Sequence, residues 1–226
     1  MNYTQLFETI KGYVENDFPN TSWTDSTGSG TVTLTSTEQI NAFIQQAEQR
    51  IYNTVELLVS REKVTGTLTG GNEYLPVPND WLSNFSFAVI DGTGRYEYLI
   101  NKDVNFIRAA YPDPSYEALP IHYAYFNEVE FLLGPTPDTN YSYELHYYRY
   151  PDSIVTAGTS WLGDNFDSVL LYGAMLEAYT FMKGEGDVMT FYQKRYDEAL
   201  MQLKMLGEGK NRQDGYRTLQ PRYPVR

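Results

Sequence analysis

The chain has 226 residues, of which 42% are hydrophobic, and a formal net charge of −12. This length is sufficient for one large domain or two small ones, each with a buried core. The negative charge argues against a free-standing nucleic-acid binder, because affinity for phosphates depends on Lys and Arg. Cysteine is absent, which excludes disulfides and thiolate metal sites. No 18-residue apolar run or signal-peptide pattern occurs, so we expect a cytoplasmic protein without a membrane partner.

Two amphipathic helices are predicted in the N-terminal quarter of the chain. Apolar residues at helical spacing predict the first helix over residues 3–18 and the second over residues 36–61. The second helix begins at a capping box, formed either by Ser36 and Gln39 or by Thr35 and Glu38. Between the two helices, residues 20–35 consist largely of Thr, Ser, Gly, Asp and Asn, which predicts a long loop with room for a short hairpin.

A β-rich region follows the second helix. The predicted strands are short and cover residues 63–68, 85–91, 96–100, 121–126, 129–133 and 141–150. Turn residues separate them, for example Gly92 and Gly94 between the second and third strands. A short helix over residues 102–110 interrupts the strands. The region therefore predicts an antiparallel β module.

Helical periodicity returns after Pro151. A third helix begins after Asp164 or Asn165 and is apolar on most of its circumference, which is typical of the buried centre of a helical bundle. A fourth helix begins at Asp187 and carries a single apolar stripe that ends at Gly207.

The order of these elements predicts an α+β fold. Residues 1–61 and 151–206 form a four-helix bundle body, since each amphipathic helix must bury its stripe. Residues 62–150 form the β module, inserted between the second and third helices. Residues 207–226 then follow as an extended C-terminal tail.

This tail, residues 207–226, reverses the charge of the rest of the chain. It holds five basic residues against Glu208 and Asp214, a net charge of +3, whereas the other residues hold 12 basic against 27 acidic ones, a net charge of −15. Its composition is that of a segment that stays extended until a partner orders it. A docking arm and a frayed terminus both remain open on composition alone.

Residues with catalytic or metal-binding chemistry are few. His122 and His146 lie on predicted strands and could face each other across an antiparallel pair, with Glu144 as a third ligand. Solvent-facing or hydrogen-bonded histidines are the commoner outcome. Since no close-spaced metal motif occurs, we expect no metal site and no cofactor.

Paired carboxylates could support glycoside hydrolysis, which needs two acids at a suitable separation. Glu128 and Glu130 form one such pair, and Asp164 and Asp167 form another. A polar strand face is the usual explanation for an i, i+2 pair beside a turn. No nucleophile elbow, phosphate-binding loop or dinucleotide fingerprint is present, so we expect no enzymatic activity.

Tyrosine is unusually frequent, with 21 residues, many of them clustered in the β module. Its large apolar area and polar tip suit a surface that is buried against another subunit, and they also suit sugar binding. Tyrosine is equally favoured on any half-buried sheet. The candidate residues for an interface with a neighbouring subunit or the tail are Trp23, Tyr123, Tyr125, Tyr147 and Tyr148.

Several short motifs occur in an order that resembles a known family. These motifs are Ile44–Ile51 on the second helix, Tyr74–Leu82 at the entry to the β module, the Gly134–Pro135 turn, Tyr147–Pro151 at its exit and Trp161–Leu162 before the third helix. Together they resemble the head-to-tail adaptor proteins of tailed bacteriophages, of the tail tubular protein A kind. The resemblance extends over about residues 1–206.

The resemblance implies a virion protein, assembled in the host cytoplasm, that forms a ring of usually twelve copies under the portal. Its partners would be the portal protein, neighbouring copies of the adaptor, and a tail nozzle or tail-completion protein. DNA would pass through the lumen without specific binding. The tail would dock on the portal through the anchors Tyr216, Arg217, Leu219, Arg222 and Tyr223, because aromatic residues and Arg dominate binding energy at interfaces.

Two other functions remain as alternatives. A surface glycan-binding module could be built on the tyrosine-rich β module, although it would leave the basic tail without a purpose. A cell-wall hydrolase would require a carboxylate pair in a cleft. Only the adaptor hypothesis requires the tail.

Overall fold

The computed structural model describes residues 1–24 and 30–211, the last four of them by their backbone alone. The chain divides into two compact units, which we call the helical unit and the β unit. The helical unit comprises Met1–Val59 and Pro151–Arg226, and the β unit comprises Ser60–Tyr150. With seven α-helices and several antiparallel sheets among the described residues, the predicted α+β class is confirmed.

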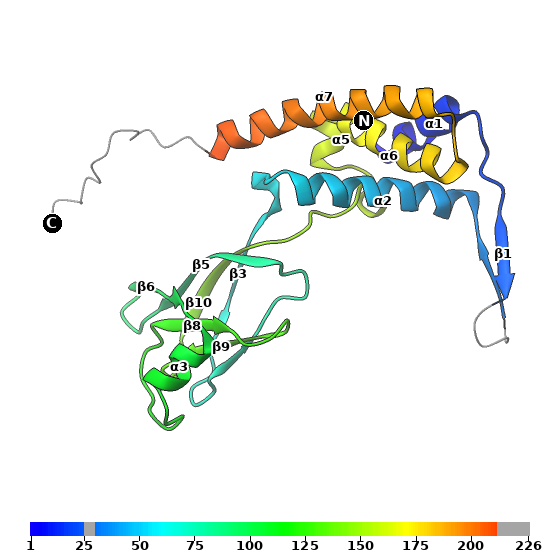
Figure 1. Cartoon of the computed structure of the whole chain (residues 1–226). Coiled ribbons are helices and arrows are strands. Elements are labelled where there is room, and N and C mark those ends of the chain that lie inside the picture. Colours follow the sequence, from blue (N-terminus) through cyan, green and yellow to red (C-terminus); the bar gives the residue numbers. More distant parts are fainter. Residues whose placement is uncertain (25–29, 212–226) are drawn as a thin grey trace. The chain divides into compact units, whose positions relative to one another are not determined.

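The four predicted helices correspond to α1, α2, α6 and α7 of the helical unit (Figure 1). Their bounds are Tyr3–Val14, Ser36–Thr54, Asp167–Met182 and Gly186–Asn211, so α1 and α2 end before the predicted residues 18 and 61. Two short helices that the sequence did not predict, α4 and α5, cover Ile154–Ala157 and Trp161–Asn165. Of the two capping boxes considered for α2, the structure has that of Thr35 and Glu38. The Thr35 side chain accepts from the Glu38 backbone N–H, and the Glu38 carboxylate accepts from the Thr35 backbone N–H.

Helix α6 is the most deeply buried of these helices. It contacts α1, α2, α5 and α7, and eight of its 16 residues are buried. Gly173 permits the closest approach, since a Cβ at this position would lie 3.1 Å from the Ala47 Cβ of α2 and 3.2 Å from the Tyr196 ring of α7. A larger residue would push the helices apart, so the sequence places its smallest residue where three helices meet.

Helix α7 does not end at Gly207, as predicted from the glycine, but continues to Asn211. Gly207 does not end the helix but allows it to pack closely against neighbouring residues. A Cβ at this position would lie 3.1 Å from the Glu56 carbonyl oxygen and 3.3 Å from the Val55 side chain. The missing side chain therefore lets α7 lie against the end of α2.

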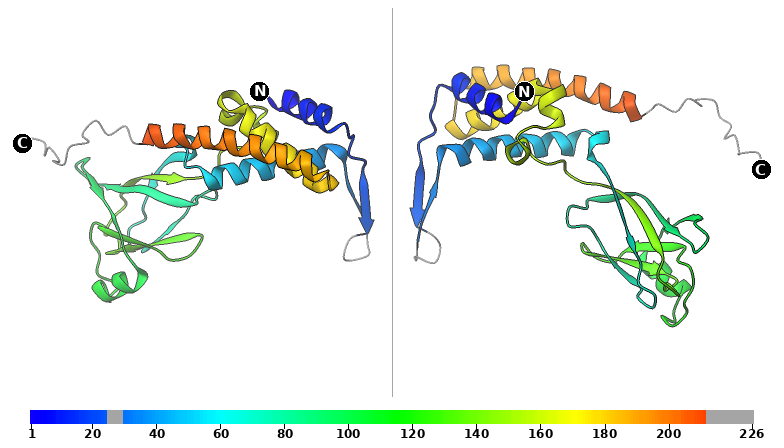
Figure 2. Two further views of the ribbon diagram at one scale, coloured as in Figure 1. Left: turned by 45° about the horizontal axis from the view of Figure 1, so that its top comes forward. Right: turned by 180° about the vertical axis from the view of Figure 1, so that it is seen from behind.

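Residues 20–35 contain a two-stranded antiparallel ribbon that we call the hairpin. Its strands are β1 (Thr21–Thr24) and β2 (Thr31–Leu34), which pair Trp23 with Val32. The ribbon projects from the N-terminal end of α2 (Figures 1 and 2). Seven of its eight strand residues are exposed.

The β unit contains two four-stranded sheets and one short helix. The first sheet has the order β3-β10-β5-β6 and the second has the order β4-β9-β8-β7. The bounds are β3 Arg61–Thr67, β4 Tyr74–Pro76, β5 Ser83–Ile90, β6 Tyr96–Tyr98, β7 Ile100–Asn101, β8 His122–Tyr125, β9 Glu130–Gly134, β10 Ser142–Tyr148 and α3 Val104–Ala110. The core between the sheets is rich in aromatic residues, with Phe87 and Phe131 at its centre.

One pair of strands departs from the predicted antiparallel arrangement. Strand β7 pairs with β8 in parallel, with Ile100 opposite His122. The chain between the two strands contains α3, and a crossover of this length is what a parallel pair requires. The other six strand pairings among the described residues, that of the hairpin included, are antiparallel.

Candidate interaction surfaces

The predicted portal anchors lie outside the described residues. Tyr216, Arg217, Leu219, Arg222 and Tyr223 all fall within residues 212–226, and the description ends at Asn211. The proposal that they dock on a partner therefore depends on their sequence.

The five aromatic residues predicted to form an interface differ in exposure. Trp23 is 50% exposed and Tyr125 is 42% exposed, whereas Tyr148 is half-buried. Tyr123 and Tyr147 are only 6% and 4% exposed and belong to the core of the β unit. The Tyr123 ring packs there against the rings of Phe87 and Phe131. We therefore no longer place these two tyrosines at an interface.

The two histidines do not face each other, as the sequence suggested they could. His122 lies on β8 in one sheet and His146 lies on β10 in the other. The Nδ1 atom of His122 lies 3.0 Å from the Tyr111 hydroxyl, and burial lowers the pKa of His122 with a smaller contribution from Lys102. Within residues 1–24 and 30–211, no group of three or more acidic or imidazole side chains is arranged to hold a metal ion.

Of the four carboxylates considered for hydrolysis, two are exposed and two, Glu130 and Asp167, are half-buried. Glu128 is exposed in the turn between β8 and β9, and Glu130 begins β9. Asp164 is exposed on α5, and Asp167 begins α6. Neither pair lines the pocket described next.

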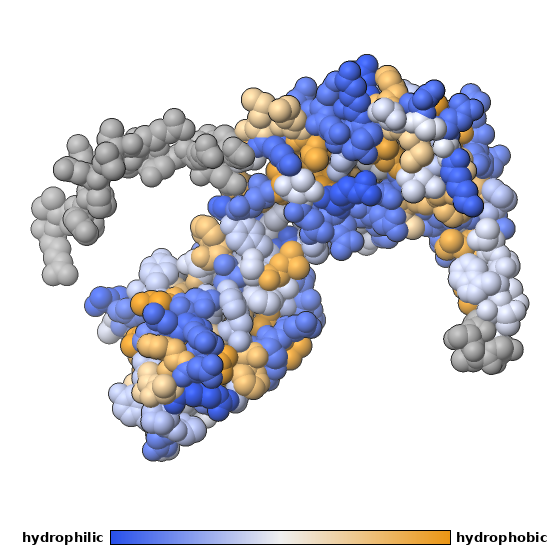
Figure 3. All heavy atoms as spheres, in the orientation of Figure 1, coloured by the Kyte–Doolittle hydropathy of each residue, from blue (hydrophilic) through white to orange (hydrophobic). Residues whose placement is uncertain are grey.

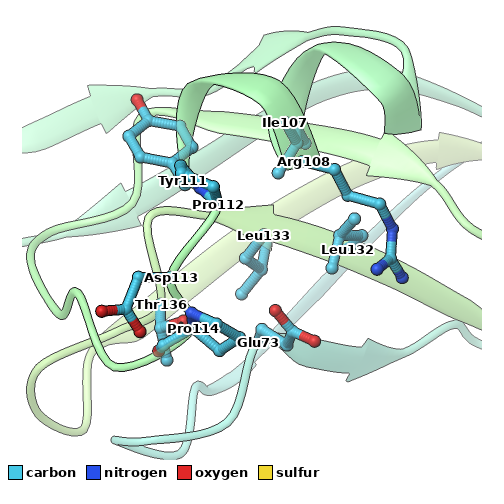
Figure 4. Close-up of a pocket in the computed structure, with 10 residues that line it drawn as sticks. All are labelled: Glu73, Ile107, Arg108, Tyr111, Pro112, Asp113, Pro114, Leu132, Leu133 and Thr136. Carbon is cyan, nitrogen blue, oxygen red and sulfur yellow. Dashed lines mark hydrogen bonds between the residues drawn. The ribbon is translucent and has the colours of Figure 1, made fainter.

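A small pocket lies between α3 and β9 in the β unit (Figure 4). Arg108, Glu73 and Asp113 contribute charged groups to it, while Leu132 and Leu133 line it from β9. Its volume is about 90 Å³, whereas pockets for small molecules usually have ~300–1,000 Å³. It has room for a few water molecules but not for a sugar chain.

Glu48 is a buried carboxylic acid in the helical unit. Its side chain is 3% exposed, and its Oε1 atom accepts the Ile154 backbone N–H at 2.9 Å. This bond ties α2 to the segment that returns from the β unit. Burial raises the pKa of Glu48, opposed by the hydrogen bonds from Ile154 and Ser153. This role could not be predicted from the sequence, because Glu48 occupies an ordinary position in a helix.

We expect Glu48→Gln to stabilise the protein at neutral and alkaline pH. The folded state binds the Glu48 proton more tightly than the unfolded state does, so the contribution of Glu48 to stability is largest at acidic pH. That contribution is lost as the pH rises through the raised folded pKa. The amide keeps an acceptor for Ile154 without a buried charge. Chemical unfolding of the parent and of Glu48→Gln is measured from pH 4 to pH 8. The difference between their free energies of unfolding should widen as the pH rises.

Glu48→Ala provides the matched control for this prediction. It removes the acceptor and leaves the Ile154 N–H without its partner. We expect it to cost about 1–3 kcal/mol of unfolding free energy. If the free energies of unfolding of Glu48→Gln and the parent differ by the same amount at every pH, Glu48 is not a buried acid with a raised pKa.

The base of the hairpin is held by polar contacts that the sequence did not reveal. The Gln39 side chain is 2% exposed, and its Nε2 atom donates to the carbonyl oxygens of Pro19 at 3.0 Å and Leu34 at 3.4 Å. The Ser36 hydroxyl donates to the Asp17 carbonyl oxygen at 2.6 Å. These contacts connect both ends of the hairpin to the first turn of α2.

Helix α7 carries a second exposed apolar surface. Phe191, Met201 and Met205 are 53%, 66% and 71% exposed. At about 100° per residue these positions fall within roughly 80° of one another, so they share one side of the helix. We call this side the outer face of α7. Light orange groups in the hydropathy view lie near the C-terminal end of the helix (Figure 3).

These observations define a protein with large exposed apolar groups on both units, which is typical of a protein that binds other proteins. More specifically, the chain belongs to the SU10 adaptor protein family, whose sequence model matches residues 1–222. None of the curated proteins compared with the chain matches it. Membership confirms the predicted relationship to phage adaptors. The protein is thus a structural phage adaptor and a component of the virion.

Helices that could span a membrane are not found in the described parts of the chain. Each helix there is either too short or too polar to cross the hydrocarbon core of a bilayer.

Proposed function

We propose that this adaptor forms a ring that joins the portal to the tail of the phage particle. The expected number of copies in the ring is twelve. The portal protein binds on one side, and a tail nozzle or tail-completion protein binds on the other. The observation that carries the proposal is the match to the adaptor family over residues 1–222. The ring is assembled in the host cytoplasm and remains in the neck of the virion.

The C-terminal tail is the part that docks on the portal. Residues 212–226 contain four arginines and one acidic residue, Asp214, and they also contain Tyr216 and Tyr223. Arg and Tyr are the residues that most often carry binding energy at interfaces. An extended arm of this kind loses conformational freedom when it docks, and a large contact surface offsets that loss.

The acidic units suit a passage for DNA. Residues 60–150 hold 12 acidic and six basic side chains, a net charge of −6, and the helical unit is also acidic. Closed into a ring, such units give a lumen that repels phosphates, so DNA passes without binding. The family itself consists of structural proteins, which favours this function over glycan binding or hydrolysis.

Electron microscopy in negative stain tests the proposal. The full chain is mixed with the portal protein encoded by the same phage genome. We expect a symmetric ring stacked on the portal. A bare portal beside monomeric chain across a range of salt concentrations would overturn the proposed function.

A further inference from the structure

The hairpin exposes an apolar pair that no other part of the described chain, residues 1–24 and 30–211, covers. Trp23 and Val32 lie opposite each other across the two strands and are 50% and 42% exposed. The next pair, Ser22 and Thr33, points to the opposite side of the ribbon, where their hydroxyls lie 2.9 Å apart. The hairpin therefore has one apolar side and one polar side.

The hairpin is held in place although it contributes little to a core. Isolated two-stranded hairpins are marginally stable in water. Here Gln39 and Ser36 anchor both ends of the ribbon through side chain to backbone bonds. Phe18, just before the ribbon, is 1% exposed and packs against Phe43. A hairpin with a fixed base and an exposed tryptophan is typical of a segment that is preorganised to bind another molecule.

The charge of the hairpin narrows the choice of partner. Residues 21–34 contain one charged side chain, Asp25, and no Lys or Arg. Nucleic acids and anionic lipid surfaces are bound through basic residues, so they do not fit this arm. A second copy of this acidic chain fits better, because a nearly uncharged arm meets little like-charge repulsion there.

The outer face of α7 has the complementary chemistry. Phe191 and the two exposed methionines offer apolar contact sites, with Lys194 and Glu198 between them on the same side of the helix, and Met side chains adapt readily to an incoming ring. Beside them, the Arg195 guanidinium lies 5.3 Å from the centre of the Phe191 ring. An Arg at this place can also stack on an indole, the best aromatic partner for a cation.

We propose that the hairpin of one adaptor docks through Trp23 and Val32 on the outer face of α7 of a neighbouring copy. This inference rests on the proposed ring. A ring is closed by two different surfaces on each copy, and the hairpin and α7 provide such a pair. Each copy docks its hairpin on one neighbour and binds the hairpin of the other neighbour on its α7.

Photo-crosslinking tests which surface receives the arm. Trp23 is replaced by p-benzoylphenylalanine in the full chain, which is mixed with an equal amount of ¹⁵N-labelled chain and with the portal protein. We expect crosslinks from position 23 to α7 near Phe191, Met201 or Met205, in peptides that combine labelled and unlabelled chains. Crosslinks to the portal protein or to another surface of the adaptor would overturn the inference.

Variants on both surfaces provide an independent test. We expect Trp23→Ala to raise the chain concentration needed for half-maximal ring assembly about tenfold or more. The double variant Met201→Gln with Met205→Gln should raise this concentration by a similar factor, although both positions lie far from the hairpin in the sequence. Both positions are exposed, so the substitutions place polar side chains on the surface. Thr33→Val is the matched control, since it changes the opposite side of the same ribbon.

Ring formation by the parent chain and by the variants distinguishes a failure of this inference from a failure of the proposed function. Rings that form with the parent chain and equally well with the Trp23 and α7 variants would overturn only the docking of the hairpin. If the parent chain forms no ring on the portal under any condition, the proposed function fails, and this inference fails with it.

Discussion

Deleting residues 212–226 is expected to abolish binding to the portal protein while leaving both units folded. The deletion removes four arginines and the aromatic anchors Tyr216 and Tyr223. Loss of several such groups at one interface exceeds the ~2 kcal/mol of a single hot spot, so affinity should fall by about 100-fold or more. Surface plasmon resonance on immobilised portal measures the loss. Thermal unfolding of the shortened chain should match that of the parent.

A scrambled tail distinguishes sequence-specific docking from charge attraction. The scrambled chain keeps the composition of residues 212–226 but changes the order of its arginines and tyrosines. We expect it to bind weakly and to lose even that binding in 0.5 M salt, since screening at this ionic strength suppresses exposed charge pairs. Full binding by the truncated chain would refute the docking tail, and full binding by the scrambled chain would refute specific anchors.

Phe87→Ala is expected to destabilise the β unit by about 3–5 kcal/mol, the usual cost of truncating a buried phenylalanine. Phe87 is 2% exposed, and its ring centre lies within 6.0 Å of those of Tyr123, Phe131 and Tyr143. The substitution therefore opens a cavity in the middle of the aromatic core. Chemical denaturation followed by circular dichroism measures the change.

Phe85→Ala is the matched control, because Phe85 lies on the same strand but is 55% exposed. We expect it to cost much less. Hydrogen exchange locates the effect of Phe87→Ala: the amides of Ser60–Tyr150 should lose protection while α2 and α6 keep theirs, since the chain divides into two compact units. Equal loss in both units would show that they unfold together.

Much of the helical unit could be predicted from the sequence. The periodicity of α1, α2, α6 and α7 depends on residues three and four positions apart, and the capping box of Thr35 and Glu38 depends on residues three apart. Such patterns are local and do not need the tertiary structure to be read. The order of short motifs was also sufficient to identify the adaptor family.

The β unit shows where local patterns were insufficient. Tyrosine frequency marked Tyr123 and Tyr125 equally, yet the first is in the core and the second is on the surface. Both side chains lie on the same side of β8, but Tyr125 is the last residue of that strand. The pairing of strands is equally hidden from local patterns, because it joins residues far apart in the chain. The same cause separates His122 and His146 into two sheets and makes β7 and β8 parallel.

By itself the sequence determined the presence of the four long helices, the charge reversal of the tail and the family, because each depends on composition, order or spacing along the chain. The tertiary structure alone decided the surfaces. It buried Glu48 against Ile154, turned Gly207 from a helix end into a packing contact, and left Trp23 and the outer face of α7 uncovered. Burial and exposure depend on contacts between distant segments, and the spacing of residues in one segment does not record them.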